Sequence, residues 1–181
     1  MSRSDDVEII RRALDAAVEI LRPYTPGSVE YRFKEGDDPV TAADDAVNDA
    51  LKALLHRDGD GWLSEETADD PARLEKRRVW IVDPLDGTRE FVAGIPEWCV
   101  SIGLVEDGEA VAGGICNPAT GQVVLGARGL GVTLNGVPAR PTAATSLQGA
   151  LVLGSRSEFK RGEWARFGEA PFRTGPINTV C

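Results

Sequence analysis

The sequence predicts a layered α+β fold, in which amphipathic helices pack against a mostly antiparallel sheet. Apolar residues recur at helical spacing near the N-terminus, a continuous apolar run occupies residues 79–82, and three strand-like segments joined by turns fill residues 98–127. A chain of 181 residues, of which 42% are hydrophobic, can bury a core without disulfides or structural metals. We therefore expect a globular protein rather than a disordered one.

Two helices are predicted in the first third of the chain. The first covers residues 7–21 and ends before Pro23, because proline cannot extend a helix. The second begins after Thr41, whose hydroxyl and the Asp44 carboxylate form the two halves of a capping box. Between the helices, residues 28–34 alternate between apolar and polar side chains and predict a strand.

The middle of the chain predicts the strands of the sheet. Residues 79–82 form a continuous apolar run, which is typical of a strand buried on both faces. Asp83 and Pro84 end this run, because proline has no N–H group for the ladder. The remaining predicted elements are a short helix at 87–92, strands at 98–105, 110–116, 122–127 and 151–153, and a helix at 158–167.

Charge and composition exclude several classes of function. The net charge of −9 argues against nucleic-acid polymers, which need a basic surface, but it allows small phosphorylated substrates when cations neutralise the site. No apolar stretch has the length of a membrane helix, and the N-terminus lacks the apolar core of a signal peptide. Cys99 and Cys116 lie in apolar runs and are expected to be small buried residues. We expect a cytoplasmic protein with no membrane partner.

The strongest functional signal is the hexapeptide Asp-Pro-Leu-Asp-Gly-Thr at residues 83–88. Asp83 follows a buried strand and the proline turns the chain, so that Asp86 can face the same point as Asp83. Two adjacent carboxylates repel, and a divalent cation that prefers oxygen ligands, such as Mg²⁺, relieves that repulsion. Gly87 and Thr88 offer backbone N–H groups to a phosphate. The alternative is a plain strand-to-helix turn with a capping aspartate.

Two further acidic residues can join this site. Glu65, in the segment Ser64-Glu65-Glu66, reaches the same cation if the residues before it pair beside the strand that ends at Asp83. A solvated loop is the alternative for this pair of glutamates. Asp44 completes a capping box, and the same carboxylate can orient a water molecule if its helix begins beside the site.

These motifs, in this order, resemble the lithium-sensitive, Mg²⁺-dependent phosphatases that include inositol monophosphatase, the 3′(2′),5′-bisphosphate nucleotidases and some fructose-1,6-bisphosphatases. The resemblance rests on Pro-Val-Thr-Ala-Ala-Asp at 39–44, Ser-Glu-Glu at 64–66 and Trp-Ile-Val-Asp-Pro-Leu-Asp-Gly-Thr at 80–88, and it covers residues 7–173. It implies a layered α/β sandwich of the sugar-phosphatase type. The implied activity is the hydrolysis of a phosphomonoester by metal-activated water.

The resemblance also implies a role for each site residue. The expected metal ligands, for two to three Mg²⁺ ions in the family, are Glu65, Asp83, Asp86 and the carbonyl of Leu85. The expected catalytic residues are Asp44, Glu65 and Thr88, of which Asp44 and Thr88 would position the attacking water. The expected substrate-binding residues are Leu85, Asp86, Gly87 and Thr88.

The residues that follow this motif bear on the substrate. Arg89-Glu90-Phe91 looks more like the bisphosphate nucleotidases than like inositol monophosphatase, where Thr-Asn-Phe is usual. This difference favours 3′-phosphoadenosine 5′-phosphate as the substrate, with inositol 1-phosphate as the alternative. In either case the expected partner is a small phosphorylated metabolite.

One feature of the family pattern is missing. The pattern continues with a Trp-Asp-x-Ala-Ala-Gly segment in a C-terminal α/β domain, and the nearest string here, Glu163-Trp164-Ala165, lacks the aspartate. We expect an N-terminal α+β domain at residues 1–173 and an irregular tail at 174–181. The C-terminal α/β domain is expected to be missing or truncated.

This departure leaves functions of another class open. One is a non-catalytic remnant that binds Mg²⁺ or a phosphorylated ligand without turnover. Another is a structural cation site in an ordinary α+β domain. Apolar surface left uncovered by the missing domain would favour association, so a homodimer is one expectation.

Overall fold

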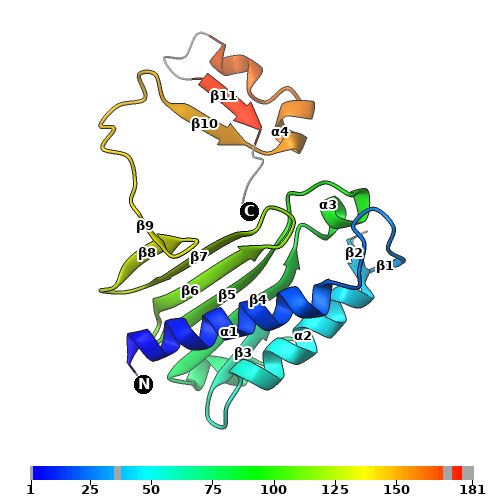
Figure 1. Cartoon of the computed structure of the whole chain (residues 1–181), viewed down its shortest axis with the longest axis vertical. Helices are drawn as coiled ribbons and strands as arrows, with labels where there is room; N and C mark the ends of the chain where they lie inside the picture. The colour runs from blue at the N-terminus through cyan, green and yellow to red at the C-terminus, as the bar shows by residue number, and fades with distance from the viewer. Residues whose placement is uncertain (1, 35–37, 169–172, 177–181) are drawn as a thin grey trace. The chain divides into compact units, whose positions relative to one another are not determined.

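The computed structural model describes residues 2–34, 38–168 and 173–176. These residues form two compact units, one that extends to Ala139 and one that begins at Arg140 (Figure 1). None of the described helices combines the length and the hydropathy that a membrane crossing requires.

The larger unit is built on a seven-stranded sheet with the strand order β3-β4-β5-β6-β7-β8-β9 (Figure 1). β3 and β4 are parallel and the other neighbouring strands are antiparallel, which confirms the mostly antiparallel sheet. The strands are β3 (Gly61–Ser64), β4 (Arg78–Asp86), β5 (Cys99–Glu106), β6 (Glu109–Asn117), β7 (Gln122–Ala127), β8 (Gly131–Leu134) and β9 (Val137–Ala139).

Two helices cover one face of this sheet (Figure 1). α1 (Arg3–Leu21) packs against α2 (Ala42–Leu55), β6 and β7, and α2 also packs against β4. Both predicted helices are confirmed, and each begins with a capping box that satisfies N–H groups of its first turn. The smaller elements are a hairpin of β1 (Tyr31–Phe33) and β2 (Pro39–Thr41), the 3-10 helix η1 (Pro71–Glu75) and α3 (Thr88–Ala93).

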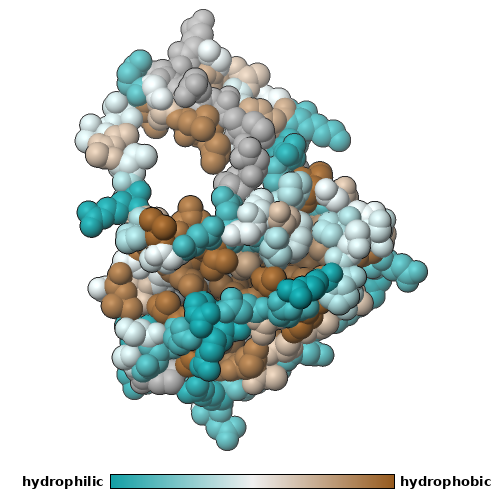
Figure 2. Space-filling model, viewed as in Figure 1, coloured by the Kyte–Doolittle hydropathy of each residue, from teal (hydrophilic) through white to brown (hydrophobic). Residues whose placement is uncertain are grey.

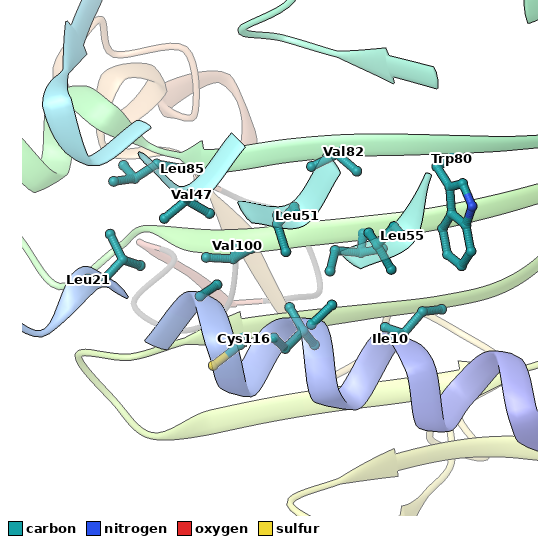
Figure 3. Packing of buried hydrophobic residues seen from close by; sticks show 14 of the residues in the cluster. Ile10, Leu21, Val47, Leu51, Leu55, Trp80, Val82, Leu85, Val100 and Cys116 are labelled. Carbon is teal, nitrogen blue, oxygen red and sulfur yellow. The ribbon is translucent and has the colours of Figure 1, made fainter. Parts of the chain in front are cut away.

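The hydrophobic core lies between the two helices and the sheet (Figure 3). Cys99 and Cys116 are buried, as predicted. Leu85 and Phe91 belong to the same core, so the segment at residues 83–88 is held by apolar side chains within it and just after it. The largest fully buried side chains are Trp80, Phe91, Ile10, Leu14, Leu51, Leu55, Leu85, Ile102 and Leu104.

The opposite face of the sheet carries exposed apolar residues. Ile81, in the middle of β4, is 42% exposed, whereas Trp80 and Val82 on either side of it are buried. The prediction that residues 79–82 are buried on both faces is therefore wrong, because α1 and α2 cover only one face. A shallow hollow of about 510 Å³ lies on the open face. Figure 2, which views the larger unit from the side of α1 and α2, shows that apolar residues reach the surface there as well.

β4 runs further than the sequence predicts. Its expected end was at Asp83 and Pro84, but the strand continues to Asp86, and its register with β5 is irregular between Asp83 and Asp86. This irregularity tolerates Pro84, because a residue outside the regular ladder needs no N–H donor. As a result, Asp83 and Asp86 lie at the end of one strand.

The smaller unit contains two parallel strands, β10 (Leu151–Gly154) and β11 (Arg173–Pro176). β10 confirms the predicted strand at 151–153. The single helix predicted at 158–167 is wrong, because α4 (Arg156–Lys160) and the 3-10 helix η2 (Ala165–Phe167) are separated by a turn in which Gly162 has a φ of +71°. The predicted domain boundary at 173 stays a prediction. Of the predicted irregular tail, residues 174–176 belong to β11 and residues 177–181 lie outside the described residues.

A buried charge cluster ties the start of α1 to the sheet. Asp6 is fully buried and accepts hydrogen bonds from Arg3 at 2.8 Å and from Arg78 of β4 at 2.8 Å. Glu106 of β5 pairs with the same two arginines. Because the guanidinium of Arg78 is itself largely buried, it depends on these carboxylates for its charge balance.

Replacement of Asp6 by alanine is expected to destabilise the larger unit strongly. The variant leaves Arg78 short of a buried partner, which costs about 3–5 kcal/mol of unfolding free energy. Urea denaturation measures the loss. The matched control is Asp15→Ala, which removes an exposed pair between Arg11 and Asp15 and is expected to cost less than about 0.5 kcal/mol. Equal losses in the two variants would contradict the role of the cluster.

Candidate active site

The parallel pairing of β3 with β4 positions the first acidic residue. Ser64 is the register partner of Val82, and the chain continues in step, since the Glu65 N–H group donates to the Val82 carbonyl at 3.3 Å. Glu65 therefore lies beside Asp83, the residue after Val82. This is the pairing on which the sequence-based inclusion of Glu65 depended, and the structure confirms it.

Three carboxylates converge at the end of β4. Burial, followed by the nearby negative charges of Glu65 and Asp86, raises the pKa of Asp83 to about 7. A hydrogen bond that the protonated Asp83 carboxyl group donates to Glu65 acts in the same direction, and a hydrogen bond from the Leu85 N–H group to Asp83 at 3.2 Å opposes it. The repulsion expected between the adjacent carboxylates is therefore present.

This arrangement suits a divalent cation. All the donors are oxygen atoms, and they carry negative charge that a bound Mg²⁺ ion would balance. In the part of the chain that the structure describes, no group of three or more His, Cys, Asp or Glu residues already has metal-binding geometry. The fit therefore rests on the chemistry of the donors and on the raised pKa of Asp83.

Asp44 and Thr88 form a hydrogen-bonded pair next to these carboxylates. One oxygen of the buried Asp44 accepts from the Thr41 N–H group at 2.8 Å, as the predicted capping box requires, and also from the Thr41 hydroxyl at 2.6 Å. The other oxygen is 2.9 Å from the hydroxyl of Thr88. That hydroxyl also lies 2.8 Å from the carbonyl of Leu85. The cap of α2 thus reaches into the candidate site.

Gly87 occupies a position that no other residue fits easily. Its φ is +88°, in the left-handed region. A Cβ atom added to it would lie 2.7 Å from the carbonyl oxygen of Glu97, which is backbone and cannot move aside freely. The glycine allows the chain to turn directly into α3. The adjoining cavity of about 210 Å³ is lined by Asp38, Pro39, Glu65 and residues 85–90.

Lys34, which the sequence did not single out, lies beside the two glutamates. Its ammonium group donates to Glu66 and lies 3.5 Å from Glu65. Burial lowers the pKa of Lys34, but the hydrogen bond to Glu66 and the charges of both glutamates raise it above its ordinary value. Lys34 therefore stays charged. No local pattern marks this residue, because the hairpin of β1 and β2 carries it to Glu66 from more than thirty positions away.

Two other neighbours of the site were not predicted as site residues. The thiol of Cys99 lies 3.8 Å from a carboxylate oxygen of Asp86, at the bend where β4 and β5 lose regular register. Asp38 lines the cavity and accepts a hydrogen bond from Arg89 at 2.8 Å. Arg89 was noted in the sequence only for its likeness to the nucleotidases.

Curated relatives of the chain are phosphatases by name. A histidinol-phosphatase from Mycobacterium tuberculosis is 36% identical over 97% of this chain and 68% of its own length. A 3′(2′),5′-bisphosphate nucleotidase, CysQ, from Salmonella typhimurium is 39% identical over 67% of this chain and 50% of its own length. The chain thus spans between half and about two thirds of these relatives.

Solved structures show the same architecture. The extragenic suppressor protein SuhB from Bartonella henselae matches 95% of this chain and 70% of its own, with a TM-score of 0.79 and 26% identity. An inositol monophosphatase from Zymomonas mobilis matches 98% of this chain and 70% of its own, with a TM-score of 0.76 and 29% identity. The profile of the inositol monophosphatase family matches residues 3–168. The chain therefore belongs to the inositol monophosphatase family and has its layered sandwich fold.

Proposed function

We propose that this protein is a Mg²⁺-dependent hydrolase of small phosphomonoesters. The observation that carries the proposal is the convergence of Glu65, Asp83 and Asp86 beside the hydrogen-bonded pair of Asp44 and Thr88. The named relatives are phosphatases, which supports the same reaction class. Each element of this arrangement has a use in phosphoryl transfer to water.

The metal would be held by the carboxylates of Glu65, Asp83 and Asp86 and by the carbonyl of Leu85. When bound, Mg²⁺ acidifies a coordinated water and offsets negative charge on the phosphoryl group. The family pattern suggests two to three ions. The positive charge of Lys34 offsets the negative charge of Glu66 and part of that of Glu65 at one side of the site.

Asp44 and Thr88 would orient the attacking water. A hydroxyl has one proton to donate, and two acceptors, Asp44 and the carbonyl of Leu85, lie within 2.9 Å of it. With its proton directed to one of them, the Thr88 oxygen keeps lone pairs that can accept a hydrogen bond from water. Because Asp44 is itself fixed by Thr41, the water would be held in a defined direction.

The phosphate would bind along residues 85–88. The backbone N–H groups of Gly87 and Thr88 lie at the start of α3, and the cavity of about 210 Å³ opens beside them. Arg89 and its two following residues favour 3′-phosphoadenosine 5′-phosphate among the candidate substrates. Inositol 1-phosphate and histidinol phosphate are the comparison substrates, because one relative is named a histidinol-phosphatase and another, from Mesembryanthemum crystallinum, an inositol monophosphatase.

Asp83→Asn is expected to abolish phosphate release while the chain stays folded. The amide is neutral and cannot balance a divalent cation as the carboxylate does. Release of inorganic phosphate from the three substrates, with Mg²⁺ and with or without Li⁺, measures the activity, and circular dichroism checks the fold. Full turnover in the variant would remove the site assignment. Binding without turnover by the unaltered chain would instead support the non-catalytic remnant.

Gly87→Ala is expected to lower activity by at least about tenfold, since a displacement of reacting groups near 1 Å can cost about a hundredfold. The added Cβ meets the Glu97 carbonyl, so the segment must shift. Gly121→Ala is the matched control, because Gly121 also has a positive φ but nothing lies within 4 Å of its added Cβ. Equal loss of activity in both variants would point to backbone strain alone.

The metal-free protein is expected to lose stability as the pH rises through about 7. The pKa of Asp83 is raised from 3.8 to about 7 in the folded state, so the folded state holds this proton more tightly than the unfolded state does. The stabilisation is present below pH 3.8 and is lost as the pH approaches 7. Asp83→Asn should therefore be the more stable protein at about pH 8 without Mg²⁺, and added Mg²⁺ should stabilise only the unaltered chain.

Thermal unfolding at several pH values, with chelator and with Mg²⁺, tests this expectation. Asp49→Asn serves as the control, because Asp49 is exposed on α2. A stability that is independent of Asp83 between about pH 5 and 8 would contradict the clustering of charge at this position.

A further inference from the structure

The charges around the candidate cavity are unevenly distributed. The cavity has a volume of about 210 Å³. Among the described residues that line it, Arg89 is the one cation. The acidic side chains that line it are Asp38, Glu65, Asp86 and Glu90. Positive side-chain charge along the described lining is therefore concentrated at Arg89, whereas Lys34, which pairs with Glu66 and lies 3.5 Å from Glu65, is not one of the lining residues.

We propose that Arg89 determines substrate specificity by binding a second anionic group of the substrate. The favoured class is then a small phosphomonoester that carries another phosphate or carboxylate, rather than one with a neutral or cationic remainder. This inference rests on the proposed phosphatase function and adds to it the contact by which the site would select a substrate with a second anionic group.

The position of Arg89 suits this role. It follows Thr88 directly, so its side chain begins one residue from the segment proposed to bind the scissile phosphate. The two anionic groups of the substrate must then lie within about the length of one arginine side chain of each other. A guanidinium binds phosphate or carboxylate oxygens through two parallel N–H donors, which gives it an advantage over an ammonium at such a site.

The contact between Arg89 and Asp38 provides a way to hold the guanidinium at the cavity before the substrate arrives. One N–H group of Arg89 donates to Asp38 at 2.8 Å. The side chains of Arg89 and Asp38 are 59% and 62% exposed, so this ion pair is solvated and contributes little to the stability of the fold. A doubly charged phosphate carries more negative charge than a single carboxylate, so it can compete with Asp38 for the guanidinium. The same pairing offsets the charge of Asp38, which makes that carboxylate a poorer partner for an amine on the substrate.

The test compares three ligands on one set of variants. The first ligand, adenosine 3′,5′-bisphosphate, carries a second anionic group. The second, adenosine 3′-monophosphate, carries no second charged group, and the third, histidinol phosphate, carries an amine. The variants are Arg89→Gln, Arg89→Lys and the control Arg128→Gln. Arg128 pairs with Glu109, and its side chain is 62% exposed, which is similar to that of Arg89. Glu109 is the first residue of β6, whereas the other end of β6 pairs with β5 beside Cys99, close to the site.

Arg89→Gln is expected to raise KM for the bisphosphate by about 10- to 100-fold and to leave kcat near its original value, because a charge-assisted hydrogen bond is lost. KM for the monophosphate should change by less than about threefold. Arg89→Lys should recover part of the loss, since lysine keeps the charge without the fork of donors. Arg128→Gln should leave KM for both substrates unchanged. Titration calorimetry of the bisphosphate in the presence of Ca²⁺ should show the same ranking of affinities.

The outcomes separate this inference from the proposed function. Hydrolysis of the monophosphate with an unchanged KM for the bisphosphate in Arg89→Gln would overturn the inference and leave the phosphatase function standing. Better use of histidinol phosphate than of the bisphosphate by the unaltered chain would overturn it as well. If no phosphate is released from any ligand, the calorimetric comparison still decides the role of Arg89. Absence of both binding and release would overturn the inference together with the function.

Discussion

The parallel pairing of β3 with β4 is the constraint on which the candidate site depends. β3 is four residues long, and its register with β4 sets Glu65 beside Asp83. A shift of one residue would turn the side chain of Glu65 to the other face of the sheet. The buried Trp80 and Val82 of β4 fix that register, because they fill the core under α2. Packing of the hydrophobic core therefore determines that Glu65 lies beside Asp83.

The repulsion between Glu65, Asp83 and Asp86 is evident in the raised pKa of Asp83. Asp83 cannot be ionised easily next to Glu65 and Asp86, and burial makes the problem worse. Apolar packing around Leu85 and Phe91 holds the segment in place despite the repulsion. Strain of this kind persists only where the surroundings determine the conformation, and it is typical of functional sites.

The sequence predicted the first two helices and the strands between residues 79 and 127, and its local patterns were more reliable than its account of burial and of contacts between distant segments. The hexapeptide at 83–88 and the capping box at Asp44 are local sequence patterns. The structure contains the turn from β4 into α3 at the first and the capped start of α2 at the second. The exposure of Ile81 could not be foreseen, because a continuous apolar run does not reveal whether one or both faces of a strand are covered. Lys34 was missed for a similar reason, since its contact with Glu66 joins the end of β1 to the turn after β3, and these segments lie far apart in the sequence.

Asp44 shows why stability and function cannot be separated at this site. One of its oxygens caps α2 and the other faces Thr88, so a single rigid carboxylate joins the helix to the proposed water-binding position. A replacement that removes activity would also remove a cap of about 1 kcal/mol. The proposed role of Thr88 is easier to isolate, because its hydroxyl lies on α3 and caps no helix. Loss of that hydroxyl leaves the cap of α2 intact, but it also removes a contact with the Leu85 carbonyl, so a change in turnover reports on the position of this segment as well as on the orientation of water.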